Sequence, residues 1–319
     1  MTRLGRRLLS AALLVLAAAL AAVALTLAPD RPVEDLAARW APPPSQFVDI
    51  DGMRVHLRDV GPRGDAHPLV LLHGTSASLH TWEGWVSALS AQRRVITLDL
   101  PGFALTGPFP DGDYRVERYV AFMRALLDRL AIDHAVLIGN SFGGQVAWTT
   151  ALALPDRIDA LVLVDAAGYP RAAKSVPIGF RIAQTPGLRL LMRQVLPRAF
   201  IESSLRNVYG DPSSVSDALV DRYWELTLRT GNRAALAARF EQSAPGPEWV
   251  ARIATLTLPT LILWGGRDRL IPPPLGERFE RDIAGSRRIV FDELGHVPQE
   301  EDPMRSVAPV DGFLRDHRL

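Results

Sequence analysis

The chain has 319 residues, of which 48% are hydrophobic and 22% are charged, and its 36 basic residues nearly balance its 35 acidic ones. This composition excludes collagen, coiled-coil and disordered classes, and the net charge of +1 gives no basic surface for binding nucleic acid. The length fits one large α/β domain or two smaller domains. Because the sequence has no cysteine, disulfides, cysteine-ligated metal sites and a thiol nucleophile are also excluded.

The chain begins with an apolar run that is typical of a membrane-targeting segment. Residues 8–28 are hydrophobic except for Ser10 and Thr26, and a cluster of arginines precedes them. About 20 helical residues span the roughly 30 Å hydrocarbon core of a bilayer, so residues 1–28 predict a signal anchor with a transmembrane helix. The arginines place the N-terminus in the cytoplasm and the rest of the chain on the extracytoplasmic side. A cleaved signal peptide, giving a secreted or periplasmic protein, is the alternative.

The next segments predict a linker and then an α/β domain. Residues 29–46 are charged and then rich in proline, which is typical of a stiff linker outside the core. A two-stranded hairpin around Asp51-Gly52 is expected to open the domain near Phe47. Short apolar runs follow, at residues 69–72, 95–98, 135–138, 161–164, 261–263 and 289–291. Segments with helical periodicity separate most of these runs, which predicts a mainly parallel sheet covered by helices on both faces.

One long segment interrupts this alternation. Residues 169–249 have helical patches and several prolines but no convincing strand, which predicts a helical insertion. The domain is therefore expected to have a core in two parts, residues 47–168 and 250–319, with the insertion between them.

The turn at residues 138–144, Ile-Gly-Asn-Ser-Phe-Gly-Gly, joins an apolar run to a helical pattern. A serine on a sharp strand–turn–helix junction has a strained backbone, and only small residues two positions away leave room for the chain to fold back. Gly139 and Gly143 supply that room around Ser141. A phosphate-binding turn is the alternative, but neither a Gly-Lys-Ser/Thr ending nor a G-x-G-x-x-G pattern is present. The turn therefore predicts a nucleophile elbow with Ser141 as the nucleophile.

At this point the sequence resembles the α/β-hydrolase fold superfamily, from about Phe47 to the C-terminus. The resemblance implies an eight-stranded, mainly parallel sheet and a helical cap formed by the insertion. In this family a His-Gly turn follows the third strand, and residues 71–76, Leu-Leu-His-Gly-Thr-Ser, match it. The resemblance then implies that the backbone amides of Thr75 and Phe142 form the oxyanion hole.

A serine nucleophile needs a base, and the base needs an orienting carboxylate. Among seven histidines, His296 lies in a G-H-x-P-x-x-E-x-P segment after the last strand, where the family places its base. Asp268 lies in a W-G-x-x-D-x-x-x-P segment that resembles the family's acid segment, and the chain order Ser141, Asp268, His296 fits the fold. Asp165 is the competing acid, because some members take it from that strand end. The acidic residues 292–293 leave a further alternative, a loop histidine bonded to a nearby carboxylate.

These residues predict a serine hydrolase that forms an acyl-enzyme on Ser141 and needs no metal or organic cofactor. We expect a small or medium apolar carboxylic ester as substrate, since the insertion offers apolar side chains such as Phe180, Ile182, Leu188, Leu190, Leu191, Met192, Val195 and Phe200. Hydrolysis of a carbon–carbon bond in ring-cleavage products is the first alternative, because residues 140–144 resemble those hydrolases. Val297, however, stands where they usually have an aromatic residue. A non-catalytic ligand-binding module at the membrane, attached through residues 8–28, is an alternative of another class.

Overall fold

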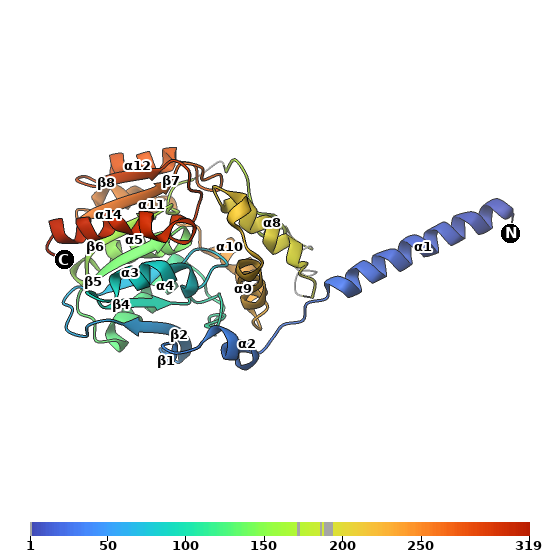
Figure 1. The fold of residues 1–319 in the computed structure, drawn as a ribbon, viewed down its shortest axis with the longest axis horizontal. Coiled ribbons are helices and arrows are strands. Elements are labelled where there is room, and N and C mark those ends of the chain that lie inside the picture. Colours follow the sequence, from blue (N-terminus) through green and yellow to red (C-terminus); the bar gives the residue numbers. More distant parts are fainter. Residues whose placement is uncertain (1, 171–172, 186, 188–193) are drawn as a thin grey trace.

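The computed structural model describes residues 2–170, 173–185, 187 and 194–319, and an eight-stranded sheet forms its centre (Figure 1). The strands are β1 (Gln46–Ile50), β2 (Met53–Val60), β3 (Leu69–Leu72), β4 (Val95–Leu98), β5 (Ala135–Asn140), β6 (Ile158–Val164), β7 (Thr260–Gly265) and β8 (Arg287–Phe291). They lie in the order β1-β2-β4-β3-β5-β6-β7-β8. β2 is antiparallel to both β1 and β4, and the other neighbouring pairs are parallel. The predicted mainly parallel, eight-stranded sheet is confirmed.

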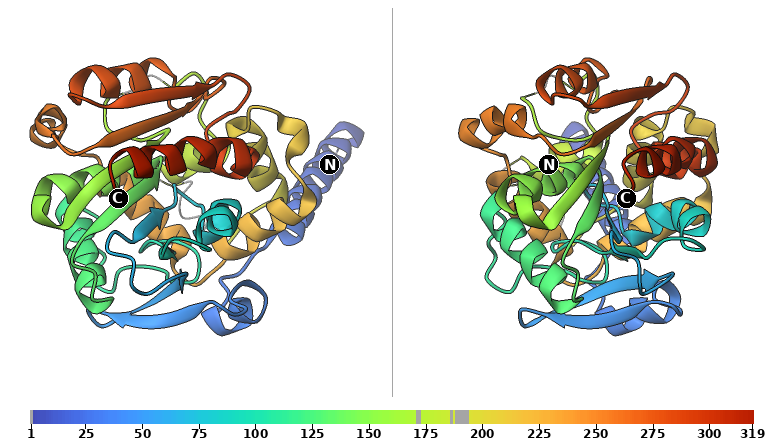
Figure 2. Two further views of the ribbon diagram at one scale, coloured as in Figure 1. Left: turned by 60° about the vertical axis from the view of Figure 1, so that its left-hand side comes forward. Right: turned by 90° about the vertical axis from the view of Figure 1, so that its left-hand side faces the viewer.

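Helices cover both faces of this sheet (Figure 2). The core helices are α3 (Glu83–Leu89), α4 (Val116–Arg129), α5 (Phe142–Ala153), α12 (Pro274–Asp282) and α14 (Pro303–Asp316). Because side chains alternate along a strand, Val70 and Leu72 share a buried cluster with α4, α5 and α12, whereas Leu69 and Leu71 pack with α3 and α14. The short apolar runs of the sequence are therefore strands buried on both faces. Short helical turns complete the core: η1 (Leu79–Trp82), η2 (Pro155–Arg157), η4 (Ile253–Thr255) and α13 (Pro298–Glu301).

The segment between β6 and β7 is helical where the structure describes it. Its elements are α6 (Ile178–Ala183), α8 (Arg198–Val208), η3 (Pro212–Ser214), α9 (Asp217–Thr227), α10 (Asn232–Gln242) and α11 (Pro247–Arg252). α8 packs against α6 and α9, and α10 packs against α6. Figure 1 shows α8, α9 and α10 between the sheet and the N-terminal helix. Leu188 and residues 190–192, which the sequence offered as pocket-lining residues, lie outside the described residues.

The N-terminal helix α1 (Arg3–Thr26) extends away from the rest of the chain (Figure 1). The sequence predicted a transmembrane helix here. In the part of the chain that the structure describes, however, no helix has both the length and the hydropathy needed to cross a bilayer. The structure therefore does not support that prediction.

Residues 29–46 differ from the stiff linker that their composition indicated. They include helix α2 (Val33–Trp40), in which Leu36 is fully buried in the same apolar cluster as α4 and α5. The indole Nε1 of Trp40 donates a hydrogen bond to Glu225 of α9 over 2.7 Å. Placing these residues outside the core was therefore wrong for α2, because Leu36, with the partly buried Val33 and Ala37, anchors this charged helix to the core.

Residues 26–31, which we call the N-terminal strap, run along the helical insertion. The amide of Ala28 donates to the carbonyl of Gln194 over 2.9 Å, and the amide of Arg31 donates to the carbonyl of Leu228 over 2.7 Å. The carboxylate of Asp30 accepts hydrogen bonds from the guanidinium of Arg233, at 2.5 and 3.2 Å. The strap therefore ties the start of the chain to the insertion.

Replacing Asp30 by asparagine is expected to lower the free energy of unfolding by about 1–3 kcal/mol, since the nearly buried Arg233 then loses its counter-charge. Glu34→Gln is the matched control, because the Glu34–Arg54 pair is exposed and 3.9 Å apart, and such pairs contribute about 0–1 kcal/mol. Urea denaturation of both variants at pH 7 makes the comparison. Equal denaturation midpoints would show that the Asp30 pair does not stabilise the fold.

Candidate active site

Ser141 lies at the junction of β5 and α5, on the strained turn that the sequence predicted. Its backbone has φ 55° and ψ −116°, a region that costs a residue with a side chain about 1–3 kcal/mol. A Cβ on Gly139 would lie 2.3 Å from the carbonyl oxygen of Gly143, and one on Gly143 would lie 2.1 Å from that of Leu72. Gly139 is thus needed for the chain to fold back around the serine, and Gly143 for the start of α5 to lie against the end of β3.

The turn after β3 lies against this serine. A Cβ built on Gly74 would be 3.1 Å from the Cβ of Ser141, so the backbone passes close beside this serine. Thr75 and Phe142, the residues expected to supply the oxyanion-hole amides, line one pocket together with Ser141. Phe142 is the first residue of α5, where backbone amides lack partners within the helix and carry partial positive charge.

His296 and Asp268 come together although 28 residues separate them. The Nδ1 atom of His296 lies 2.7 Å from Oδ2 of Asp268, and both side chains are buried. The other carboxylate oxygen of Asp268 accepts from the amides of Leu270 and Ile271, at 2.8 and 2.9 Å. A carboxylate fixed in this way orients the imidazole so that Nε2 remains available as a base. His296 and Ser141 line the same pocket.

The structure also shows where the other candidate acidic residues lie relative to His296. Asp292 and Glu293 are exposed, and Glu293 pairs with Arg305 at 2.8 Å, so neither supports the loop-histidine alternative. Asp165 is fully buried beside the Asp268–His296 pair. The geometry favours Asp268 over Asp165 as the partner of His296.

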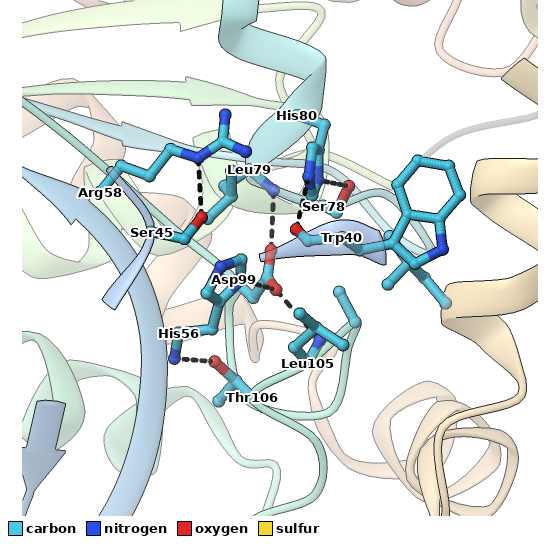
Figure 3. Close-up of polar contacts among 12 residues, drawn as sticks. Trp40, Ser45, His56, Arg58, Ser78, Leu79, His80, Asp99, Leu105 and Thr106 are labelled. Carbon is cyan, nitrogen blue, oxygen red and sulfur yellow. Dashed lines mark hydrogen bonds and ion pairs between the residues drawn. The ribbon is translucent and has the colours of Figure 1, made fainter. Parts of the chain in front are cut away.

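A second buried His–Asp pair, His56 with Asp99, lies beside the start of η1 (Figure 3). Asp99 accepts from Nδ1 of His56 over 2.7 Å and from the amides of Leu79 and Leu105, at 2.8 and 3.0 Å. Burial opposes its ionisation, but the charge and hydrogen bond of His56 lower the pKa of Asp99 to about 2. Because Asp99 joins β2, the start of η1 and the loop after β4, its role is architectural.

Two pockets of unlike character meet at Ser141. The first also contains His296 and is lined mainly by apolar side chains of the insertion, among them Phe180, Ile201 and Leu205. The second also has many apolar residues in its lining, but it adds the polar side chains of Gln145, Arg239 and Ser243. The serine can therefore reach a substrate that has one apolar and one polar part.

The family of the chain follows from this fold and from the comparisons. The model of the alpha/beta hydrolase fold family matches residues 67–303, and the chain belongs to that family. It is 32% identical over 279 residues to a 2-hydroxy-6-oxo-2,4-heptadienoate hydrolase of Pseudomonas putida, covering 84% of this chain and 95% of that protein. It is thus an α/β-hydrolase with a curated relative that hydrolyses a dienoate.

Two solved structures share the fold. A meta-cleavage product hydrolase from Pseudomonas fluorescens is 26% identical with a TM-score of 0.72, over 85% of this chain and 97% of that one. An esterase from a Rhodococcus species is also 26% identical, with a TM-score of 0.70, over 85% of this chain and 98% of that one. The similar proteins therefore include both carbon–carbon hydrolases and esterases.

Sequence reasoning missed Arg239 as a candidate site residue. Its guanidinium lies 4.5 Å from the ring centroid of Phe142 and 4.4 Å from that of Phe240. Its Nη1 donates to Ser243 over 3.2 Å. No motif marks this arginine in the sequence, since it stands in an insertion helix 98 positions after Ser141 and reaches the serine only through the fold.

Proposed function

We propose that this α/β-hydrolase cleaves a carbon–carbon bond in a ring-cleavage product, a 2-hydroxy-6-oxo dienoate, with Ser141 as nucleophile. The observation that carries the proposal is the pair of unlike pockets at Ser141. A dienoate has a carboxylate at one end and an acyl group at the other, so its two halves match the pocket that contains Arg239 and the more apolar pocket. The similarity to a dienoate hydrolase supports this reading over the ester that the sequence favoured.

The chemistry makes use of both pockets. The hydroxy-dienoate first moves a proton from its 2-hydroxyl to carbon 5, which gives a 2-oxo enone. Ser141 then gives its proton to His296 and attacks the ketone at carbon 6, while the amides of Thr75 and Phe142 stabilise the oxyanion. When the bond between carbons 5 and 6 breaks, the electron pair delocalises to the 2-oxygen, beside Arg239. The protonated His296 returns a proton to this fragment, and water releases the acyl group from Ser141.

Arg239→Gln is expected to lower kcat/KM for the dienoate by about 10–100-fold, because the anionic half then loses a charged hydrogen-bond donor worth about 1.5–3 kcal/mol. The kcat/KM for p-nitrophenyl acetate, which has no carboxylate, is expected to change by less than about threefold in the same variant. This internal control separates loss of recognition from loss of folding. An equal loss on both substrates would assign Arg239 a packing role.

Ester hydrolysis is the second candidate, supported by the apolar character of the first pocket and by Val297 beside the base, where the sequence lacks an aromatic residue. A panel of 2-hydroxy-6-oxo-2,4-heptadienoate and p-nitrophenyl esters of two to eight carbons separates the two. We expect kcat/KM for the dienoate to exceed that of the best ester. The reverse order would favour the esterase.

The location of the protein stays a prediction from the sequence. Attachment to a membrane through residues 8–28 and an extracytoplasmic catalytic domain are the expected arrangement, with release after signal cleavage as the alternative.

A further inference from the structure

Two buried carboxyl groups lie beside the single imidazole of His296. One oxygen of Asp165, one oxygen of Asp268 and a ring nitrogen of His296 are all within 4.8 Å of one another. Asp165 follows β6 and Asp268 follows β7, and these adjacent parallel strands bring their carboxyl ends together. The approach of the two acids is therefore built into the sheet.

Asp165 is buried, has a strained backbone and has a carboxyl oxygen without a hydrogen-bond partner among the described residues. Its side chain is fully buried, and its backbone has φ 45°, a strained value for a residue with a side chain. Its Oδ1 accepts a hydrogen bond from the amide of Gly265 over 2.9 Å. Its Oδ2 is buried and accepts no hydrogen bond from the described residues. An oxygen in this position is satisfied if it carries a proton itself.

The surroundings decide which acid carries the proton. Two adjacent buried carboxylates cannot both be charged without a large cost. Burial, followed by the charge of Asp268, raises the pKa of Asp165 well above its usual value, and Glu301 acts in the same direction. Asp268 instead accepts hydrogen bonds from two amides and His296, which stabilise its charged form. The negative charge therefore stays on Asp268 and the proton on Asp165.

We propose that Asp165 is a positioning residue of this site: its protonated carboxyl donates a hydrogen bond to Asp268, and it becomes the charged partner of His296 when Asp268 is removed. The proposal rests on the hydrolase function proposed above. The proton stays on Asp165 throughout the normal reaction, so Asp165 acts through Asp268 and not on the substrate. The charged and titratable groups that bear on it are Asp268, His296 and Glu301.

Four variants test this proposal: Asp165→Asn, Asp268→Asn, the double variant, and Asp292→Asn as an exposed control. Asp165→Asn is expected to keep kcat/KM within about threefold, because its amide donates the same hydrogen bond and its oxygen still accepts from Gly265. Asp268→Asn is expected to retain at least about tenfold more activity than the double variant, a coupling typical of residues in one network. The double variant should approach the loss of about 10⁴-fold known for removal of the acid.

The pH dependence of activity is a second test, because a purely structural role of Asp165 would not change it. Without the charge of Asp268, the pKa of Asp165 falls, so the activity of Asp268→Asn should rise with pH as Asp165 ionises. The double variant should lack this rise. The proposal would be overturned if the activity loss of the double variant were only the combined loss of the two single variants. Inactivity of Asp165→Asn at unchanged Tm would also overturn it.

A proton NMR measurement tests the role of Asp165 independently of the proposed function, because it needs no substrate. A far-downfield Nδ1 proton resonance of His296 reports its bond to a carboxylate, whether or not the protein turns over any substrate. We expect the resonance in the wild type and in Asp268→Asn, and its loss in the double variant. Its absence from Asp268→Asn would refute the role of Asp165, whereas failure of every substrate with the resonances as expected would refute only the proposed function.

Discussion

Ser141→Ala is expected to lower turnover about 10⁶-fold on the best substrate, because it removes the proposed nucleophile of a triad, and triads act as a unit. The variant should keep its fold, since alanine is smaller than serine and fits a backbone that is already fixed by Gly139 and Gly143. Single-substrate kinetics and a thermal melt measure the two properties.

Ser204→Ala is the matched control for this variant. Ser204 lines the first pocket, and its hydroxyl donates to the carbonyl of Phe200 over 2.7 Å instead of serving as a nucleophile. Its loss is expected to leave kcat within about threefold. A Ser141→Ala protein that retains a tenth of wild-type turnover would contradict the assignment of Ser141 as the nucleophile.

His296→Ala is expected to have an effect of similar size, about 10⁶-fold, because without a base the Ser141 hydroxyl is a poor nucleophile. The appropriate control is His67→Ala. His67 also pairs with an aspartate, Asp159, at 2.7 Å, but it is partly exposed and belongs to neither pocket at Ser141. Only the His296 variant should lose turnover in a steady-state assay. Comparable losses in both would mean that histidine–aspartate pairs matter here for stability alone.

The sheet and the nucleophile turn could be predicted because their signals are local. Runs such as residues 69–72 are apolar at every position, as strands buried on both faces must be. Gly139 meets a local steric need, because a Cβ there would meet the backbone of Gly143, four residues on; the need for Gly143 comes from the end of β3. In contrast, α2 was missed because its packing depends on Leu36 meeting a cluster formed by distant segments.

The candidate site shows the same division. The approach of His296 to Asp268 was predicted, since each lies in a segment with a recognisable pattern. The position of Arg239 and the burial of Asp165 beside Asp268 were not, because they depend on how the insertion and two strand ends come together in space. Pairing of β6 with β7 is the information that the sequence lacked.

Labelling with a fluorophosphonate probe shows whether Ser141 is an activated nucleophile. We expect the intact wild-type protein to gain the mass of one probe, peptide mapping to place the probe on Ser141, and Ser141→Ala to gain none. A wild-type protein that takes up no probe would instead favour a non-catalytic ligand-binding module, and labelling that persists in Ser141→Ala would place the nucleophile elsewhere.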